Sequence, residues 1–207
     1  MNAIVGMTNL LLAENQNGKN LRYLNAVKHS SDTLMVVIND ILDLEKLSAG
    51  NMVLEMQSIE FSKVIKQVVE INNGLTQQYN VKINLGDLPE SAIIWGDANR
   101  VMQVLTNLLS NAVKFSPERG IVDIRLIKDR QYWRVEIHDQ GPGITNEFRE
   151  RIFGAFSQSE LANVRQKGGI GLGLNIAKII VEKMEGLIGY ESDEGEGSVF
   201  WASFVAL

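Results

Sequence analysis

Four glycines within six residues make residues 168–173 the most unusual segment of this 207-residue sequence. Each glycine inside a helix costs about 1 kcal/mol relative to alanine, so this number of glycines at a helix entrance is unfavourable for packing alone. Glycine permits close approach to the backbone, and N–H groups at a helix N-terminus attract phosphate. The segment lacks the Gly-Lys-Ser/Thr ending of a P-loop, and no strand leads directly into it. We interpret it as a phosphate site; a flexible hinge before a helix is the alternative.

A second candidate is Asp139, which stands where an apolar strand ends and a Gly-Pro-Gly turn at 141–143 begins. Taken alone, this aspartate is best explained as a turn former. However, an ionised carboxylate only accepts hydrogen bonds. At the floor of a pocket it would therefore suit an amino group, such as the exocyclic amine of adenine.

The third candidate is one face of a helix, which carries Asn107, Asn111 and Lys114 within about 60° of arc. The opposite face carries apolar residues: Val101, Leu105, Leu108, Leu109 and Ala112. Asparagine is a mediocre helix former, and its amide oxygen can ligate Mg²⁺. Lysine can neutralise phosphate charge. The alternative is an ordinary exposed polar face.

The elements that position these residues alternate between strands and helices. We expect helices at 61–79, from an Asp97 cap to about residue 115, and from residue 170 or 171 to 184. The expected strands are 53–57, 81–85, 93–95, 121–128, 133–139, 187–191 and 198–205. Hairpin-linked strands mixed with long helices predict an α+β fold, a sheet covered on one face by helices.

The N-terminal 50 residues differ, because they hold only three of the 18 glycines. Ile4, Met7 and Leu11 predict a first helix, and a polar break follows at 15–20. A heptad-like seam then predicts a long helix that stops near 49–50: Leu24, Val27, Ser31, Leu34, Ile38 and Ile41. Two helices cannot bury stripes this wide alone, so we expect a homodimeric four-helix bundle; packing on the rest of the chain is the alternative.

The amino-acid composition narrows the classes of protein to which this chain could belong. The sequence is 45% hydrophobic and 22% charged, which is typical of a globular protein. It has no cysteine, which excludes disulfides and thiolate metal sites, and a net charge of -5, which argues against nucleic acid as a partner. No apolar run approaches the ~18 residues that span a bilayer, and the N-terminus does not resemble a secretory signal. We expect a cytoplasmic protein without membrane contact, or the cytoplasmic part of a membrane-bound sensor.

Five short motifs, taken together in their order and spacing, identify a protein family far more specifically than any one of them does alone. They are 107–116 (NLLSNAVKFS), 139–144 (DQGPGI), 152–158 (IFGAFSQ), 169–174 (GIGLGL) and 195–200 (GEGSVF). In order and spacing they resemble the N box, first glycine box, F box, second glycine box and final glycine motif of two-component sensor histidine kinases, very possibly of the hybrid type. Residues 2–50 are similar to the dimerisation hairpin of the same family.

The resemblance implies a truncated dimerisation hairpin at 1–50 and a catalytic ATP-binding domain at 51–207. The domain would be an α/β sandwich of the gyrase, chaperone and histidine-kinase type, with ATP and Mg²⁺ as cofactors. Asp139 would accept from the adenine amine, Asn111 would hold Mg²⁺ with Asn107 close by, and Lys114 would approach the phosphates. The implied nucleotide-binding residues are Asn107, Asn111, Lys114, Phe115, Asp139, Gly141, Gly143, Ile144, Gly169, Gly171, Leu172, Gly173, Leu174 and Ser198.

The resemblance also implies a lid over the nucleotide at 157–167, including Ser157 and Gln158. Many relatives carry a basic residue near Gln158 that meets the terminal phosphate, whereas here that position is neutral. Arg165 or Lys167 would then supply the charge. Long polar loops of this kind are usually functional.

The phosphoacceptor histidine of the family is expected a few residues before Met1, so this chain would hold the donor site without its acceptor. Neither of the two histidines replaces it: His29 is expected to be an ordinary helix residue and His138 to be structural. The implied function is transfer of the γ-phosphoryl of ATP to that histidine and then to a response-regulator receiver domain. The chain alone is expected to bind ATP or ADP without autophosphorylation. A noncatalytic nucleotide-binding dimerisation module is the alternative.

Overall fold

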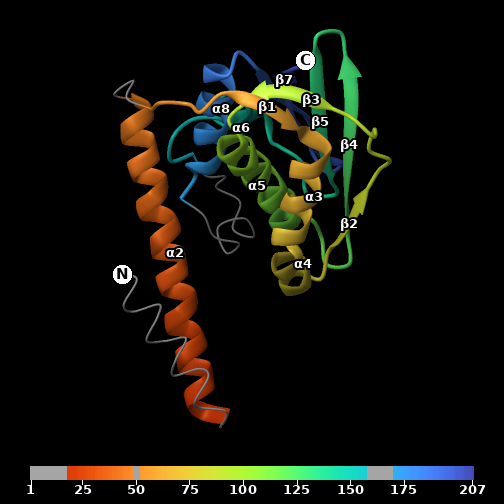
Figure 1. Cartoon of the computed structure of the whole chain (residues 1–207). Coiled ribbons are helices and arrows are strands. Elements are labelled where there is room, and N and C mark those ends of the chain that lie inside the picture. Colours follow the sequence, from red (N-terminus) through yellow and green to blue (C-terminus); the bar gives the residue numbers. More distant parts are fainter. Residues whose placement is uncertain (1–17, 49–51, 158–169) are drawn as a thin grey trace. The chain divides into compact units, whose positions relative to one another are not determined.

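The computed structural model describes residues 18–48, 52–157 and 170–207, and the chain divides into two compact units, Met1–Met52 and Val53–Leu207. Figure 1 shows the elements of both units, with colours that follow the sequence from the N-terminus to the C-terminus. In the first unit the described element is α2 (Gly18–Ser48). The predicted long helix is therefore present, but the break predicted at 15–20 is wrong for 18–20, which are helical.

Helix α2 exposes much of the seam that predicted it. Leu34, Ile38 and Ile41 are 48%, 38% and 42% exposed. Lys28 and Asp32, one turn apart, form an ion pair of 2.9 Å on the same helix. The first predicted helix, with Ile4, Met7 and Leu11, lies outside the described residues. Within the described ranges, no helix has the length and apolar character needed to cross a membrane.

The second unit is built on a five-stranded sheet of order β2-β4-β5-β7-β6. β2 and β4 pair in parallel, and the other neighbours pair antiparallel. The strands are β2 (Lys82–Leu85), β4 (Ile121–Asp129), β5 (Tyr132–Asp139), β6 (Leu187–Asp193) and β7 (Gly197–Val205). All five agree with the predicted strands to within one or two residues. The last strand in sequence, β7, lies inside the sheet.

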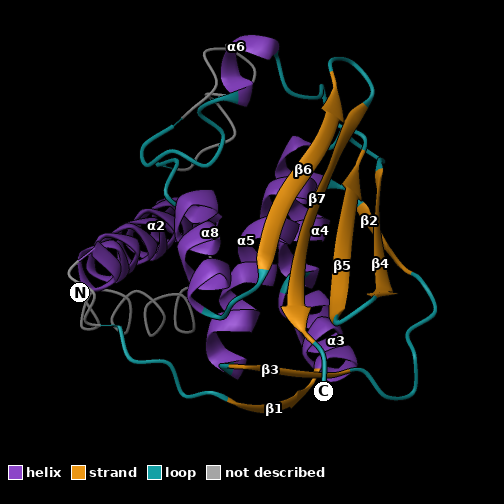
Figure 2. Cartoon of the chain, turned by 90° about the horizontal axis from the view of Figure 1, so that it is seen from above, coloured by secondary structure: helices purple, strands orange, loops and turns teal. Residues whose placement is uncertain are grey.

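Helices cover one face of this sheet, as Figure 2 shows, which confirms the predicted α+β class. They are α3 (Phe61–Ile71), α4 (Asn73–Tyr79), α5 (Ala98–Phe115) and α8 (Gly173–Lys183), and a short α6 (Asn146–Arg149) follows β5. The continuous helix predicted over 61–79 is wrong. Asn72 is buried and donates its side-chain amide to the Val68 carbonyl at 2.8 Å, so the helix ends there and α4 restarts.

A second, two-stranded sheet joins β1 (Gln57–Glu60) to β3 (Ile93–Gly96). The strand predicted over 53–57 is wrong, because pairing with β3 begins at Gln57 and Val53 is 86% exposed. The end of the chain returns to this sheet, since the Leu207 amide donates to the Ile93 carbonyl at 3.0 Å. Both ends of the second unit therefore meet at β3.

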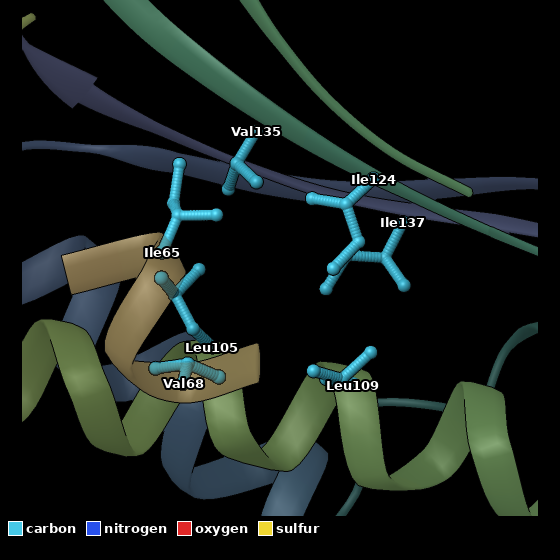
Figure 3. A pocket seen from close by; sticks show the side chains of 7 residues that line it. All are labelled: Ile65, Val68, Leu105, Leu109, Ile124, Val135 and Ile137. Atoms are coloured by element: carbon cyan, nitrogen blue, oxygen red, sulfur yellow. The ribbon is translucent and has the colours of Figure 1, made fainter. Parts of the chain in front are cut away.

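The core between α3, α5 and the sheet contains a small cavity of about 10 Å³. Figure 3 shows that only aliphatic side chains line it: Ile65, Val68, Leu105, Leu109, Ile124, Val135 and Ile137. A space of this size holds about one water, and an apolar lining offers that water no hydrogen bonds. The cavity is therefore a packing feature of the core and is separate from the residues expected to bind nucleotide.

Candidate functional site

Asp139 is the last residue of β5 and is 9% exposed. The Gly141 amide donates to its Oδ1 at 2.8 Å, and the Ser198 amide also donates to its carboxyl group. Burial raises the pKa of Asp139 from 3.8 to about 6, because it disfavours the charged form. The two amides and the nearby His138 oppose this shift of the pKa. The carboxyl group of Asp139 is therefore buried and held in place by two backbone amides.

The turn after β5 brings this carboxyl group to the end of α5. A Cβ atom on Gly141 would lie 2.8 Å from the Asp139 Oδ1 and 3.0 Å from the Phe115 carbonyl oxygen. A side chain at residue 141 would therefore force these groups apart. Gly143 has a φ of 70° and packs against the Asp193 backbone, a conformation that favours glycine. Ile144, next in the turn, is buried.

Helix α5 is fixed at its start by the predicted cap. The Asp97 Oδ1 accepts from the Asn99 and Arg100 amides at 3.0 and 3.2 Å, which satisfies donors that a helix start leaves unpaired. The apolar face of the helix is buried, with Leu108 at 0% exposure. The polar face, with Asn107, Asn111 and Lys114, lies at intermediate exposure, as does Phe115 at the end of the helix.

One bond ties this polar face to α8. The Asn107 side-chain amide donates to the Gly173 carbonyl oxygen at 3.0 Å. A Cβ atom on Gly173 would lie 3.3 Å from the Asn107 Cγ, so glycine permits this approach. Helix α5 is therefore the common element of the site: its end meets the Asp139 turn through Phe115, and its middle meets the α8 entrance through Asn107.

The entrance of α8 has the backbone that its glycines predicted. Gly171 has a φ of 77° and packs against the backbone of Ser157, while Leu172 is 1% exposed and Leu174 is half-buried. The helix itself begins at Gly173, a few residues after the predicted start at residue 170 or 171. Four further predicted positions lie outside the described residues: Gln158, Arg165, Lys167 and Gly169.

Sequence reasoning missed Ser192 and the role of Gly197. The Ser192 hydroxyl contacts Ile144, Gly197 and Ser198, and Gly197, with a φ of 92°, packs against the Asp139 carbonyl. Ser192 is distant from Asp139 in sequence, and strand register alone brings it beside Ser198, the register partner of Asp139. The Gly-Glu-Gly motif was a usable signal for residue 197, but no local pattern marks residue 192.

His138 lies beside Glu136, with its Nε2 3.1 Å from a carboxylate oxygen. Successive residues of a strand point to opposite faces, so His138 faces away from the side of the sheet that carries Asp139. Among the described residues, no group of three or more His, Cys, Asp or Glu side chains could hold a metal ion.

Helices on one face of a mixed sheet, with a buried carboxyl group at the end of β5 and glycines at the entrance of α8, define an α/β sandwich. The sequence profile of the histidine kinase-, DNA gyrase B-, and HSP90-like ATPases matches residues 96–206. The chain belongs to this family, and the part of the family it resembles is the ATP-binding domain of sensor histidine kinases, with the preceding helical region.

Known proteins support this placement. The sensor histidine kinase GacS of Pseudomonas protegens is 38% identical over 210 residues, covering 98% of this chain and 23% of that protein. The signal transduction histidine-protein kinase BarA of Escherichia coli K12 is 34% identical over 212 residues, covering 97% of this chain and 22% of that protein. The chain thus spans about a quarter of these relatives.

Solved structures share the fold. Full-length ShkA in complex with AMPPNP matches with a TM-score of 0.77 and 29% identity, covering 100% of this chain and 43% of that chain. The histidine kinase AdeS of Acinetobacter baumannii matches with a TM-score of 0.73 and 22% identity, covering 98% of this chain and 93% of that chain. The predicted α/β sandwich after N-terminal helices is therefore confirmed.

Proposed function

We propose that residues 51–207 are the Mg-ATP-binding catalytic domain of a two-component sensor histidine kinase, and that residues 1–50 belong to its dimerisation hairpin. The observation that carries this proposal is Asp139, a buried carboxyl group at a strand end with its backbone amide partners. Two backbone amides donate to this group, and a further hydrogen-bond donor would offset its burial more fully. The ATP analogue in the ShkA complex supports adenine nucleotide as the source of that donor.

Within this proposal the polar face of α5 handles the phosphates. Asn111 ligates Mg²⁺ through its amide oxygen, Asn107 holds the α8 entrance close by, and Lys114 approaches the phosphates. Phe115 lines the base pocket. The turn and α8 entrance give close backbone access or complete the pocket wall: Gly141, Gly143, Ile144, Gly169, Gly171, Leu172, Gly173, Leu174 and Ser198.

The donor set fits a magnesium ion that arrives with its nucleotide. Mg²⁺ keeps several waters and takes one or two protein ligands plus substrate phosphates, so it does not need a cage of carboxylates. When bound, it would neutralise phosphate charge. Phosphoryl transfer depends mainly on positioning and charge, and the residues of this chain supply the positioning.

In the whole protein, the γ-phosphoryl group would pass to a histidine and then to an aspartate of a response regulator. We propose that the acceptor histidine is neither His29, which we take to be an ordinary residue of helix α2, nor His138, which points away from the Asp139 side of the sheet. The purified 207-residue chain should then bind Mg-ATP without acquiring acid-labile phosphate. Pairing of two helical hairpins would make the homodimer.

The proposal is tested by calorimetric titration of the 207-residue chain with Mg-ATP. Asp139→Ala should weaken the binding of Mg-ATP about 10- to 100-fold, since the substitution removes a carboxylate that accepts a hydrogen bond from the base in its ionised form. Asp129→Ala, the same change at the exposed end of β4, is the matched control and should bind as the parent does. Unchanged affinity in Asp139→Ala would overturn the pocket assignment.

A further inference from the structure

Three strands bring polar side chains into one row at the end of the sheet. Asp139 on β5 is the register partner of Ser198 on β7, and Ser198 is the register partner of Ser192 on β6. Register partners in neighbouring strands point to the same face of a sheet. Ser192 therefore stands on the same side as Asp139, one strand further from it than Ser198.

The hydroxyl of Ser192 uses all of its hydrogen-bonding capacity. It donates to the Gly197 carbonyl oxygen at 2.8 Å and accepts from the Ile144 amide at 3.0 Å. The third neighbour is the Ser198 hydroxyl at 2.9 Å. Because a serine has a single O–H hydrogen, Ser192 must accept from Ser198 once it donates to Gly197. The Ser198 hydroxyl is then left with acceptor capacity only.

The backbone of Ser192 is held as well. Arg149 of α6 donates to the Ser192 carbonyl oxygen, and its guanidinium lies 3.4 Å from the Asp193 carboxylate. The Tyr190 hydroxyl donates to the Arg149 carbonyl oxygen at 3.1 Å. Helix α6, the turn at Ile144 and strands β6 and β7 therefore converge on one residue.

We propose that Ser192 is a positioning residue of the nucleotide pocket, which fixes the Ser198 hydroxyl as an acceptor beside Asp139 and holds the turn at Ile144. The pocket then shows two neighbouring acceptors to a base that carries an amino group. This inference rests on the proposed function. It adds that selection of the base depends on a serine outside the pocket.

The test compares Mg-ADP with Mg-IDP, whose base has an oxo group in place of the amine, by calorimetric titration of the 207-residue chain. The parent chain should prefer ADP. In Ser192→Ala the preference for ADP over IDP should fall about fivefold, because Ser198 loses the acceptor that orients its hydroxyl. Ser192→Thr retains a hydroxyl and should restore the preference. An unchanged preference in Ser192→Ala, with or without a loss of overall affinity, would refute the proposal.

Controls separate positioning from general stability. Ser203→Ala makes the same change at a buried serine of the neighbouring strand β7 and should leave the preference unchanged. If circular dichroism shows that Ser192→Ala is unfolded, Ser192→Cys keeps the size with a weak donor and should show the same reduced preference. Asp139→Ala distinguishes the two ideas. If Asp139→Ala retains full ADP affinity, the proposed function fails. If Asp139→Ala loses ADP affinity while folded Ser192→Ala or Ser192→Cys keeps the parent's preference for ADP, this inference alone fails.

Discussion

Asp139 shows how a binding residue can weaken the fold that carries it. Its carboxyl group is 9% exposed, and its pKa is raised from 3.8 to about 6. Between these values the folded state holds the proton more tightly than the unfolded state does. The contribution of Asp139 to stability is therefore complete below about pH 3.8 and is lost as the pH rises through about 6.

Because ionised Asp139 destabilises the fold, we predict the effect of Asp139→Asn, a substitution that removes the charge and keeps the shape of the side chain. At about pH 8 its free energy of unfolding should exceed that of the parent by about 1–3 kcal/mol, as expected for a raised pKa of this size. At about pH 3, below the pKa of Asp139 in both the folded and the unfolded state, the two proteins should be equally stable, since both then carry a neutral group. Urea denaturation at the two pH values measures this, and a difference independent of pH would contradict it.

At the scale of elements, helix α5 packs one face into the hydrophobic core and carries the polar residues of the proposed nucleotide site on another. Leu109 is 0% exposed and lines the core cavity, whereas Asn111 lies at intermediate exposure. Leu109→Ala should lower the free energy of unfolding by about 2–5 kcal/mol through the enlarged cavity.

Asn111→Ala, half a turn further along, should change stability by less than about 0.5 kcal/mol and weaken Mg-ATP binding about tenfold. Denaturation and calorimetry on both variants measure the two effects. A large stability loss in Asn111→Ala would mean that the second face also belongs to the core.

The α8 entrance offers a matched pair of glycines. Gly171 and Gly195 have φ values of 77° and 88°, but a Cβ atom at Gly195 would meet nothing within 4 Å, whereas one at Gly171 would meet the Ser157 backbone. Both alanine variants should lose about 1–2 kcal/mol for the left-handed backbone. Gly171→Ala should lose about 1–3 kcal/mol more through the clash. Equal midpoints in urea denaturation would argue against close packing at Ser157.

Local patterns predicted most elements of the second unit because its strands are short, apolar and bounded by turn residues. The Asp97 cap is an example, since capping depends on residues three positions apart at most. The break at Asn72 was missed, because the apolar periodicity continues across it and only a buried side-chain bond to Val68 marks it. The prediction of a strand over 53–57 was wrong for a related reason, because pairing with β3 decides where β1 begins.

Prediction of the site from sequence was limited in the same way, because local patterns do not reveal contacts between residues distant in sequence. Motif spacing pointed to Asn107, Asp139 and the α8 glycines, and the structure gives the backbone contacts around them. Their roles toward nucleotide remain predictions. Ser192 had no local signature, because it reaches the site through the pairing of β6 with β7, which joins residues in a register that no short pattern encodes.

At the scale of the molecule, all residues proposed to bind nucleotide lie in the second compact unit. A fragment of residues 53–207 should therefore fold alone and bind Mg-ADP with an affinity within about threefold of the full chain. Circular dichroism and calorimetry on the fragment and on the 207-residue chain provide the comparison. Loss of binding by a folded fragment would show that the first unit contributes to the pocket.

The place of β7 has a consequence for synthesis on the ribosome. This strand is the last in sequence, yet it lies between β5 and β6, and its Phe204 and Ala202 are 0% exposed. A nascent chain that has not yet released these residues leaves β5 and β6 without their shared neighbour. Closure of the sheet must wait until translation has passed Val205, so a stop codon placed before Ser198, which removes nearly all of β7, should leave β5 and β6 unpaired and prevent the sheet from closing.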